Sequence, residues 1–271
     1  MNHQVLVDGY FQASAPFWRD IYNQADVLSR AYQLRFTTVL EQIRHLGLPP
    51  GAPALEVGCG AGHTTAALAA RGFKVEALDA AQAMVDATQA RIHAAGVSTR
   101  AHTSLGNIHH LPFPDSTFSL AVAVGVLPWL ADRDRAVAEL TRVVDHRGFV
   151  LLTTDNSRSL THLLDPSLNP LVHPLKRTVA RLLRPDVARA TFCPNSDVDR
   201  TLARHGLRKL WSTTVGFGPF TFLNCRVLPA RAGEWLQEYL QQAVSNGSTS
   251  LRNAGSHYIV LAQKNSLNGK D

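Results

Sequence analysis

The sequence predicts an α/β protein built on a doubly wound, mostly parallel sheet of seven strands with an antiparallel last strand. Between about residues 53 and 154, short apolar runs alternate strictly with stretches of helical periodicity. Such alternation produces right-handed crossovers and a parallel sheet. The run at 118–124 is apolar throughout, as in strands that are buried on both faces.

The elements can be placed in order along the chain. In the core we expect strands at 54–57, 73–78, 99–104, 118–124 and 148–154, and helices at 64–70, 81–96 and 132–144. Before the core, residues 16–47 predict two helices separated near Asp26–Ser29. After it we expect a helix at 196–205, a strand at 207–215, a helix at 231–244 and a final strand at 257–263.

We expect a single domain with four parts. Residues 1–48 form an N-terminal helical lid, 49–156 the core, 157–195 a cap insertion after the fifth strand, and 196–271 the completion of the core. The segment that begins the cap, NSRSLTHLLDPSLNPLVHPLKRTVARLLRPD, contains four prolines and is too long for a plain connection. It is therefore predicted to be a partly helical insertion over the functional site.

Charge is distributed unevenly. Residues 1–156 hold 12 Lys and Arg against 14 Asp and Glu, whereas residues 157–271 hold 15 against 7. The basic surplus, concentrated between Lys176 and Arg189, suits a solvated helix face, an anionic acceptor, a membrane surface or a nucleic acid. We expect no DNA partner, disfavour RNA, and leave open a peripheral membrane contact through the basic cap. The sequence does not indicate an oligomeric state.

The chain begins without the basic start and apolar centre of a signal peptide, and it has no run of about 18 apolar residues that could span a membrane. Its three cysteines, Cys59, Cys193 and Cys225, have no metal-ligand spacing. They are interpreted as reduced thiols. These observations predict a cytoplasmic protein without a metal site.

One apolar run ends in glycines at every second position, in ALEVGCGAGHTTAAL from Ala54 to Leu68. Glycine lets the backbone approach a ligand closely. Asp79 ends the next strand, 19 residues after Gly60, where a carboxylate can accept both ribose hydroxyls or cap the following helix. The spacing is not the G-x-G-x-x-G of dinucleotide sites, and no GK[ST] of a phosphate loop follows.

With Glu56 ahead of it, the pattern E-x-G-x-G-x-G resembles motif I of class I S-adenosylmethionine (SAM)-dependent methyltransferases. GNIHHLPFPDSTFSLAVAVGVLPWL and AELTRVVDHRGFVLLTT resemble later segments of the same family, in the right order. The resemblance covers about residues 50–156 and points to the small-molecule branch, which includes ubiquinone, menaquinone and magnesium-protoporphyrin methyltransferases. It implies a Rossmann-like fold with SAM as cofactor.

The resemblance also implies cofactor contacts. The glycines would lie beside the methionine part of SAM, Asp79 would hold the ribose, Asn107 and Ile108 would meet the adenine, and Met84 would cover its face or serve as a core contact. The full set of implied contacts is Tyr22, Glu56, Gly58, Gly60, Gly62, Asp79, Ala80, Met84, Asn107, Ile108, Gly125 and Val126.

Methyl transfer from a sulfonium chiefly requires alignment and exclusion of water. A base is needed only where the nucleophile keeps its proton at neutral pH. His162 and His173, in the cap, are the candidates for that role, whereas His63, His109 and His110 are interpreted as loop hydrogen-bonding residues. Enzymes that methylate nucleobase or glutamine nitrogens place Asn or Asp where this chain has Val124, which argues against those acceptors.

The aromatic N-terminal segment YFQASAPFWRDIY resembles a lid that folds over SAM in small-molecule methyltransferases. The cap, together with residues 216–224, is expected to form an apolar acceptor pocket with a basic rim. We therefore expect a small, hydrophobic acceptor carrying an anionic group, with O-methylation favoured over N- or C-methylation. An NAD(P)-dependent oxidoreductase, an RNA-directed methyltransferase and a non-catalytic SAM-binding protein are the alternatives.

Overall fold

The computed structural model describes residues 3–24, 26–166, 169, 188, 190–223, 225–248 and 250–265. Its main sheet has the strand order β3-β2-β1-β4-β5-β9-β6. The strands are β1 (Pro53–Val57), β2 (Lys74–Asp79), β3 (Ala101–Leu105), β4 (Phe118–Ala123), β5 (Val144–Asp155), β6 (Leu207–Val215) and β9 (His257–Lys264). β9 is antiparallel to both β5 and β6, while β1 to β5 pair in parallel. The predicted seven-stranded, Rossmann-like fold is confirmed.

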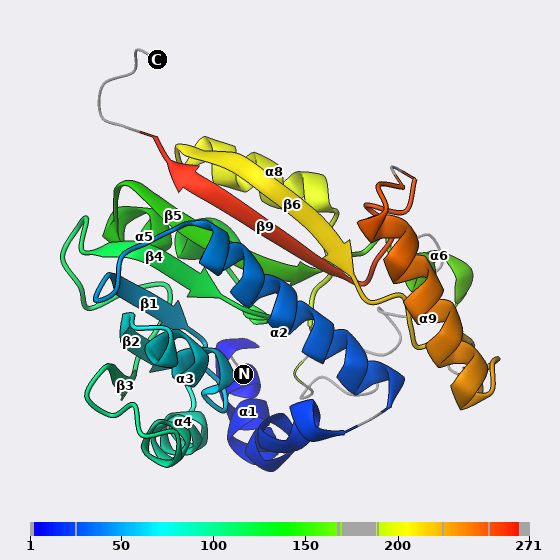
Figure 1. The fold of residues 1–271 in the computed structure, drawn as a ribbon, viewed down its shortest axis with the longest axis horizontal. Helices are drawn as coiled ribbons and strands as arrows, with labels where there is room; N and C mark the ends of the chain where they lie inside the picture. The colour runs from blue at the N-terminus through cyan, green and yellow to red at the C-terminus, as the bar shows by residue number, and fades with distance from the viewer. Residues whose placement is uncertain are drawn as a thin grey trace.

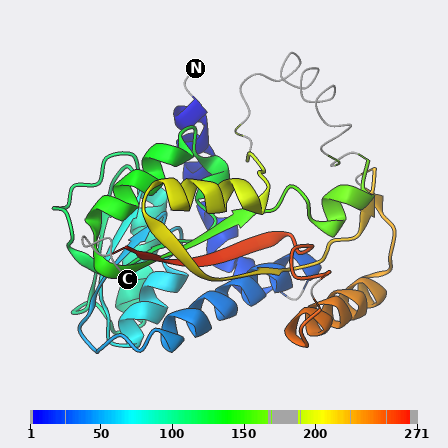
Figure 2. The same cartoon turned by 90° about the horizontal axis from the view of Figure 1, so that it is seen from above.

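Helices cover both faces of this sheet (Figures 1 and 2). One layer contains α5 (Arg133–Val143) and α8 (Asn195–Arg204), and the other contains α2 (Val27–His45), α3 (His63–Ala70) and α4 (Gln82–Ala94). Each layer has its own hydrophobic cluster. Leu152 of β5 packs with the α5 and α8 side, and its neighbour Leu151 packs with the α2, α3 and α4 side, because alternate residues of a strand face opposite ways.

The predicted break between the N-terminal helices is confirmed. The side chain of Asp26 accepts hydrogen bonds from the backbone N–H groups of Leu28 (2.9 Å) and Ser29 (3.3 Å) and so caps α2. The first helix, α1 (His3–Asp20), starts well before the position predicted from Pro16, which lies inside it. Proline usually marks a helix start, but here Val7, 3% exposed, anchors the earlier turns to the core.

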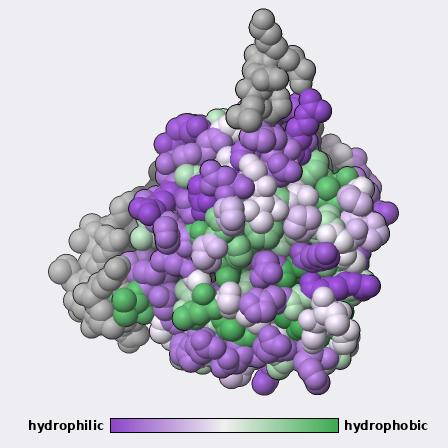
Figure 3. Space-filling view, turned by 90° about the vertical axis from the view of Figure 1, so that its left-hand side faces the viewer, coloured by the Kyte–Doolittle hydropathy of each residue, from purple (hydrophilic) through white to green (hydrophobic). Residues whose placement is uncertain are grey.

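The remaining elements lie at the carboxyl ends of the strands or beyond the sheet edge. They are η1 (Ile21–Asn23), η2 (Leu127–Trp129), α6 (Leu160–Leu164), α9 (Ala230–Ser245) and the two-stranded sheet of β7 (Thr221–Phe222) and β8 (Cys225–Arg226). Most of the predicted cap lies outside the described residues. Among the helices that are described, none is long and apolar enough to cross a membrane. The face seen in Figure 3 is largely hydrophilic, with apolar atoms gathered in its middle.

Candidate functional site

A cavity of about 160 Å³ lies at the carboxyl ends of β1 to β5 and beneath α1. This is the edge at which open α/β sheets bind ligands. Among the predicted cofactor contacts, it is lined by Tyr22, Glu56, Gly58, Gly60, Asp79, Ala80, Met84, Asn107, Ile108, Gly125 and Val126. The structure therefore brings together the predicted set from the ends of β1 to β4 and from the N-terminal segment, with the exception of Gly62.

The glycine turn is hydrogen-bonded to the neighbouring strand, β2. The N–H groups of Gly58 and Cys59 both donate to the carbonyl oxygen of Leu78, at 2.7 and 3.0 Å. Gly58 has a φ of +68°, and a Cβ there would lie 2.3 Å from Cγ2 of Val126. The turn therefore needs glycine for its backbone conformation and for its close approach to the β4–η2 connection.

Asp79 connects this turn to the start of α4. Its Oδ2 accepts from the N–H of Gly60 (2.9 Å), and its Oδ1 accepts from the N–H of Ala81 (3.0 Å). Burial raises the pKa of the Asp79 carboxyl above its ordinary value, although these backbone donors oppose the shift. Each carboxylate oxygen keeps a further lone pair for a ligand, so the two roles predicted for Asp79 are compatible.

Gly62 serves packing rather than the cavity wall. It precedes α3 with a φ of +77°, and a Cβ there would meet Cα of Thr88 at 2.8 Å. The Thr88 hydroxyl in turn donates to the carbonyl oxygen of Gly60 at 2.8 Å. This glycine therefore allows α4 to approach the turn closely.

Glu56 is a buried carboxyl group at the end of β1, only 2% exposed. The hydroxyl of Thr65 donates to its Oε2. Burial raises the pKa of Glu56 to about 8, and hydrogen bonds from Thr65 and Thr64 only partly offset it. Glu56 is therefore largely protonated at neutral pH in this form of the protein.

The β2–β3 side of the cavity is apolar with one amide. Met84 is 1% exposed and Ile108 5% exposed, and both lie on the cavity wall. The side-chain oxygen of Asn107 accepts from the backbone N–H of His109 at 2.9 Å. The amide nitrogen of Asn107 thus remains the group that can donate to a ligand.

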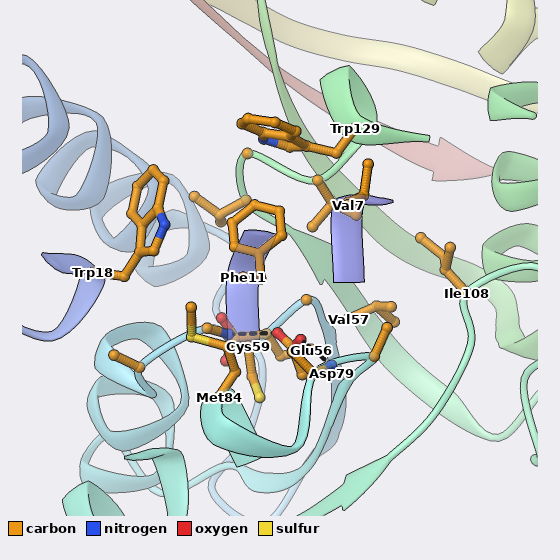
Figure 4. A pocket seen from close by; sticks show the side chains of 18 of the residues that line it. Val7, Phe11, Trp18, Glu56, Val57, Cys59, Asp79, Met84, Ile108 and Trp129 are labelled. Carbon is orange, nitrogen blue, oxygen red and sulfur yellow. Dashed lines mark hydrogen bonds between the residues drawn. The ribbon is translucent and has the colours of Figure 1, made fainter. Parts of the chain in front are cut away.

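Aromatic side chains form the opposite wall. In Figure 4, Val7, Phe11, Trp18 and Trp129 lie across the cavity from Asp79 and Met84. Trp129 stacks on Tyr10 of α1, with ring centroids 5.2 Å apart, and meets Phe11 edge-on at 5.0 Å. These contacts fasten α1 to η2.

The cavity is also lined by Tyr32, Arg35 and Asp155, which were not among the predicted contacts. Nδ1 of His257 lies 2.9 Å from Oδ1 of Asp155. Burial is the largest single influence and would raise the pKa of Asp155, but the hydrogen bond with His257 and the electrostatic effects of His257, Arg35 and His162 together hold the pKa below its ordinary value. Arg35 follows the same helical spacing as Val39 and Ile43, which are buried. A charged residue in the apolar stripe of a helix was the signal available in the sequence.

The histidines divide between two kinds of position. His63 contacts the carbonyl oxygen of Arg19 through Nε2 at 3.1 Å, and burial lowers its pKa to about 4. Nε2 of His109 contacts the carbonyl oxygen of Asp132 at 2.9 Å. His162 lies in α6 beside Phe192 and does not line the cavity. His173, the other candidate base, lies outside the described residues.

The predicted acceptor pocket is only partly described. The basic run from Lys176 to Arg184 lies outside the described residues. None of the described residues of 157–195 or of 216–223 lines the cavity. Phe217 is instead fully buried. The cationic side chain on the cavity wall, at the ends of β4 and β5, is instead Arg35 of α2.

Comparisons with known proteins agree with this geometry. Residues 55–152 match the family model of the methyltransferase domain. A malonyl-[acyl-carrier protein] O-methyltransferase of Serratia marcescens is 35% identical over 116 residues, which are 43% of this chain and 43% of that protein. An ajmaline N-methyltransferase of Rauvolfia serpentina is 26% identical over 150 residues, 55% of this chain and 50% of that protein. The matches therefore span about half the length of these relatives.

The fold comparison reaches further along the chain. The crystal structure of magnesium protoporphyrin IX methyltransferase from Synechocystis, solved with bound S-adenosylhomocysteine, superposes with a TM-score of 0.67 at 15% identity. It covers 97% of this chain and 100% of that one. At this level of identity the likeness establishes the fold. Together with the domain match, it confirms the recognition of a class I SAM-dependent methyltransferase domain, a family whose cofactor is SAM.

Proposed function

We propose that this chain, whose residues 55–152 form a methyltransferase domain, transfers a methyl group from SAM to a small acceptor, with oxygen as the favoured nucleophile. One observation carries the proposal. The glycine turn and the Asp79 carboxylate face the same cavity as an aromatic wall supplied by α1 and η2. The relative from Serratia, an O-methyltransferase, supports oxygen as the acceptor atom.

The residues of the cavity fit SAM. No atom lies within 4 Å of the position that a Cβ of Gly60 would take, so the turn leaves space beside its backbone. Asp79 would accept hydrogen bonds from the ribose hydroxyls, and Asn107 would donate to the adenine between Met84 and Ile108. Residues 1–48 would act as a lid through α1.

SAM supplies an electrophilic methyl group bonded to a positively charged sulfur. An acceptor oxygen would take this methyl group, and the electron pair of the broken carbon–sulfur bond would remain on sulfur. A carboxylate acceptor is already ionised at neutral pH and needs no base. The contribution of the protein is to align the two partners and to exclude water, for which α1 and Trp129 cover the cavity.

For the acceptor we propose a hydrophobic molecule that carries a carboxylate, such as a malonyl thioester. The support comes from the aromatic wall, from Arg35 on the cavity surface and from the relative that acts on malonyl-[acyl-carrier protein]. N-methylation is the second candidate, because the relative from Rauvolfia is an N-methyltransferase.

Isothermal titration calorimetry with SAM tests the cofactor assignment. We expect wild-type protein to bind SAM, and Asp79→Ala to bind at least about tenfold more weakly, because a lost hydrogen bond at a charged acceptor costs roughly 1.5–3 kcal/mol. Asp86→Ala is the matched control, because Asp86 is an exposed carboxylate of α4 whose one hydrogen-bond partner among the described residues is Gln82. Folded protein that binds NADH and not SAM would refute the proposal.

Transfer itself is tested by mass spectrometry of the malonyl thioester of N-acetylcysteamine after incubation with protein and SAM. We expect an ester carrying one added methyl group. A methylated amine product from an alkaloid acceptor, with no ester formed, would instead favour the N-methyltransferase candidate.

A further inference from the structure

Arg35 of α2 is a buried cation facing the cavity. The residue is 5% exposed, and its Nε has no hydrogen-bond partner among the residues that the structure describes. Its guanidinium carbon lies 4.7 Å from the centre of the Tyr32 ring. An ideal Cβ on Gly125 would lie 2.9 Å from Nη1 of Arg35, so the guanidinium packs directly on the backbone after β4.

A buried guanidinium without hydrogen bonds is costly, and buried polar groups in native proteins nearly always have partners. Among the carboxyl groups that line the cavity, Asp155 is the one whose pKa Arg35 helps to lower, but Oδ1 of Asp155 contacts Nδ1 of His257 at 2.9 Å. Within the described part of the chain, Arg35 makes neither an ion pair nor a hydrogen bond with Asp155. The donors of Arg35 are therefore left for a group that enters the cavity.

A second donor lies nearby. Nε1 of Trp18 is also buried and has no partner among the described residues, and Trp18 lines the same cavity. In Figure 4 the indole nitrogen is turned toward the cavity. Trp18 meets the ring of Tyr32 edge-on at 5.6 Å, and that ring also contacts Arg35. Two side chains with unsatisfied donors thus pack on one aromatic ring.

The position of these donors indicates which part of a ligand they would meet. Asp79 and Asn107 lie at the ends of β2 and β3, whereas Arg35 lies against the ends of β4 and β5. In the strand order these are opposite ends of the cavity. Arg35 therefore lies away from the nucleoside positions and on the side where methyl transfer would occur.

We propose that Arg35 and Trp18 form a carboxylate-binding subsite, a role that rests on the proposed function of this cavity. A guanidinium offers a fork of N–H donors whose geometry matches a carboxylate, and the indole N–H adds one further bond. Two molecules could supply the carboxylate: the acceptor, or SAM through its amino-acid group. Both sources require the same two donors, and binding measurements separate them.

The test compares three probes by calorimetry on wild type, Arg35→Gln and Arg35→Lys. The probes are S-adenosylhomocysteine, methylthioadenosine (which lacks the carboxylate) and, on protein saturated with S-adenosylhomocysteine, the malonyl thioester of N-acetylcysteamine. If the cofactor supplies the carboxylate, Arg35→Gln weakens S-adenosylhomocysteine binding at least tenfold and leaves methylthioadenosine unchanged. If the acceptor supplies the carboxylate, the affinities for both nucleosides are unchanged and the affinity for the thioester falls at least tenfold.

Arg35→Gln that leaves all three affinities within twofold of wild type overturns the subsite. Trp18→Phe keeps an aromatic ring and removes the N–H. It should lower the affinity for the same probe by a few fold, and it provides the test of the subsite if Arg35→Gln does not fold. Arg35→Lys keeps the positive charge but not the paired N–H donors of the guanidinium, so it should retain part of the affinity that Arg35→Gln loses. Wild type that binds neither nucleoside refutes the proposed function, and the subsite is then judged by thioester binding to the protein without a nucleoside, which Arg35→Gln should weaken at least tenfold.

Discussion

The three glycines of the turn show how one sequence pattern can serve three physical needs. Gly58 avoids Val126, Gly60 leaves open space beside the cavity, and Gly62 avoids the backbone of Thr88. The sequence predicted all three as ligand contacts because their spacing is identical. Only the packing of α4 against the turn distinguishes Gly62, and no local pattern encodes the position of a helix that begins 20 residues later.

Alanine at these positions should separate the roles. Gly60→Ala should cost about 1–2 kcal/mol, the strain of a left-handed residue. Gly62→Ala should cost a further 1–3 kcal/mol, because its Cβ overlaps backbone that cannot rotate away. Urea unfolding monitored by circular dichroism measures both. Equal losses in the two variants would contradict the packing role of Gly62.

Glu56 should make stability depend on pH. Its pKa is about 8 in the folded protein and near 4.5 when unfolded, so the folded chain holds a proton that the unfolded chain has lost. The free energy of unfolding should therefore fall as pH rises from about 4.5 to 8, by at most about 1.4 kcal/mol per pH unit. Glu56→Gln should flatten this slope in urea unfolding. A variant with the wild-type slope would exclude a raised pKa.

At the level of secondary structure, periodicity predicted the strands and helices of the core within a few residues. Its errors fall where tertiary contacts override local preference. α1 passes through Pro16 because earlier residues such as Val7 and Phe11 pack on the cavity. β5 starts at Val144, directly after α5, because Val144 pairs with Phe118 of β4. Neither contact is local in sequence.

The attachment of α1 to η2 should control access to the cavity. Trp129→Ala removes the stack on Tyr10 and the edge contact with Phe11. It should increase proteolytic cleavage within residues 3–20 and speed S-adenosylhomocysteine dissociation several-fold, measured by limited proteolysis and stopped-flow fluorescence. Trp235→Ala is the matched control, since Trp235 is 64% exposed on α9 and, within the described part of the chain, stacks on Tyr239 alone. Identical cleavage of the two variants would argue against a lid.

Across the whole molecule, fold class and the nucleoside half of the site could be predicted because both depend on order along the chain. Strand ends carry Gly58, Asp79 and Asn107, and a parallel sheet places such ends at one edge. The other half could not be predicted. Asp155 also ends a parallel strand, but Arg35 comes from a helix before the sheet, and only the packing of α2 against the ends of β4 and β5 brings the two together.

The central sheet joins two hydrophobic layers, and the protein should therefore unfold as one unit. Leu151 and Leu152 are adjacent in β5, fully buried, and belong to opposite clusters. Leu151→Ala and Leu152→Ala should each lower the free energy of unfolding by about 2–5 kcal/mol, the cost of a cavity left by leucine. Both should retain a single transition by calorimetry and by circular dichroism, because β5 bonds to β4 and β9 whichever face is weakened. A variant that melts in two steps would mean that one layer folds without the other.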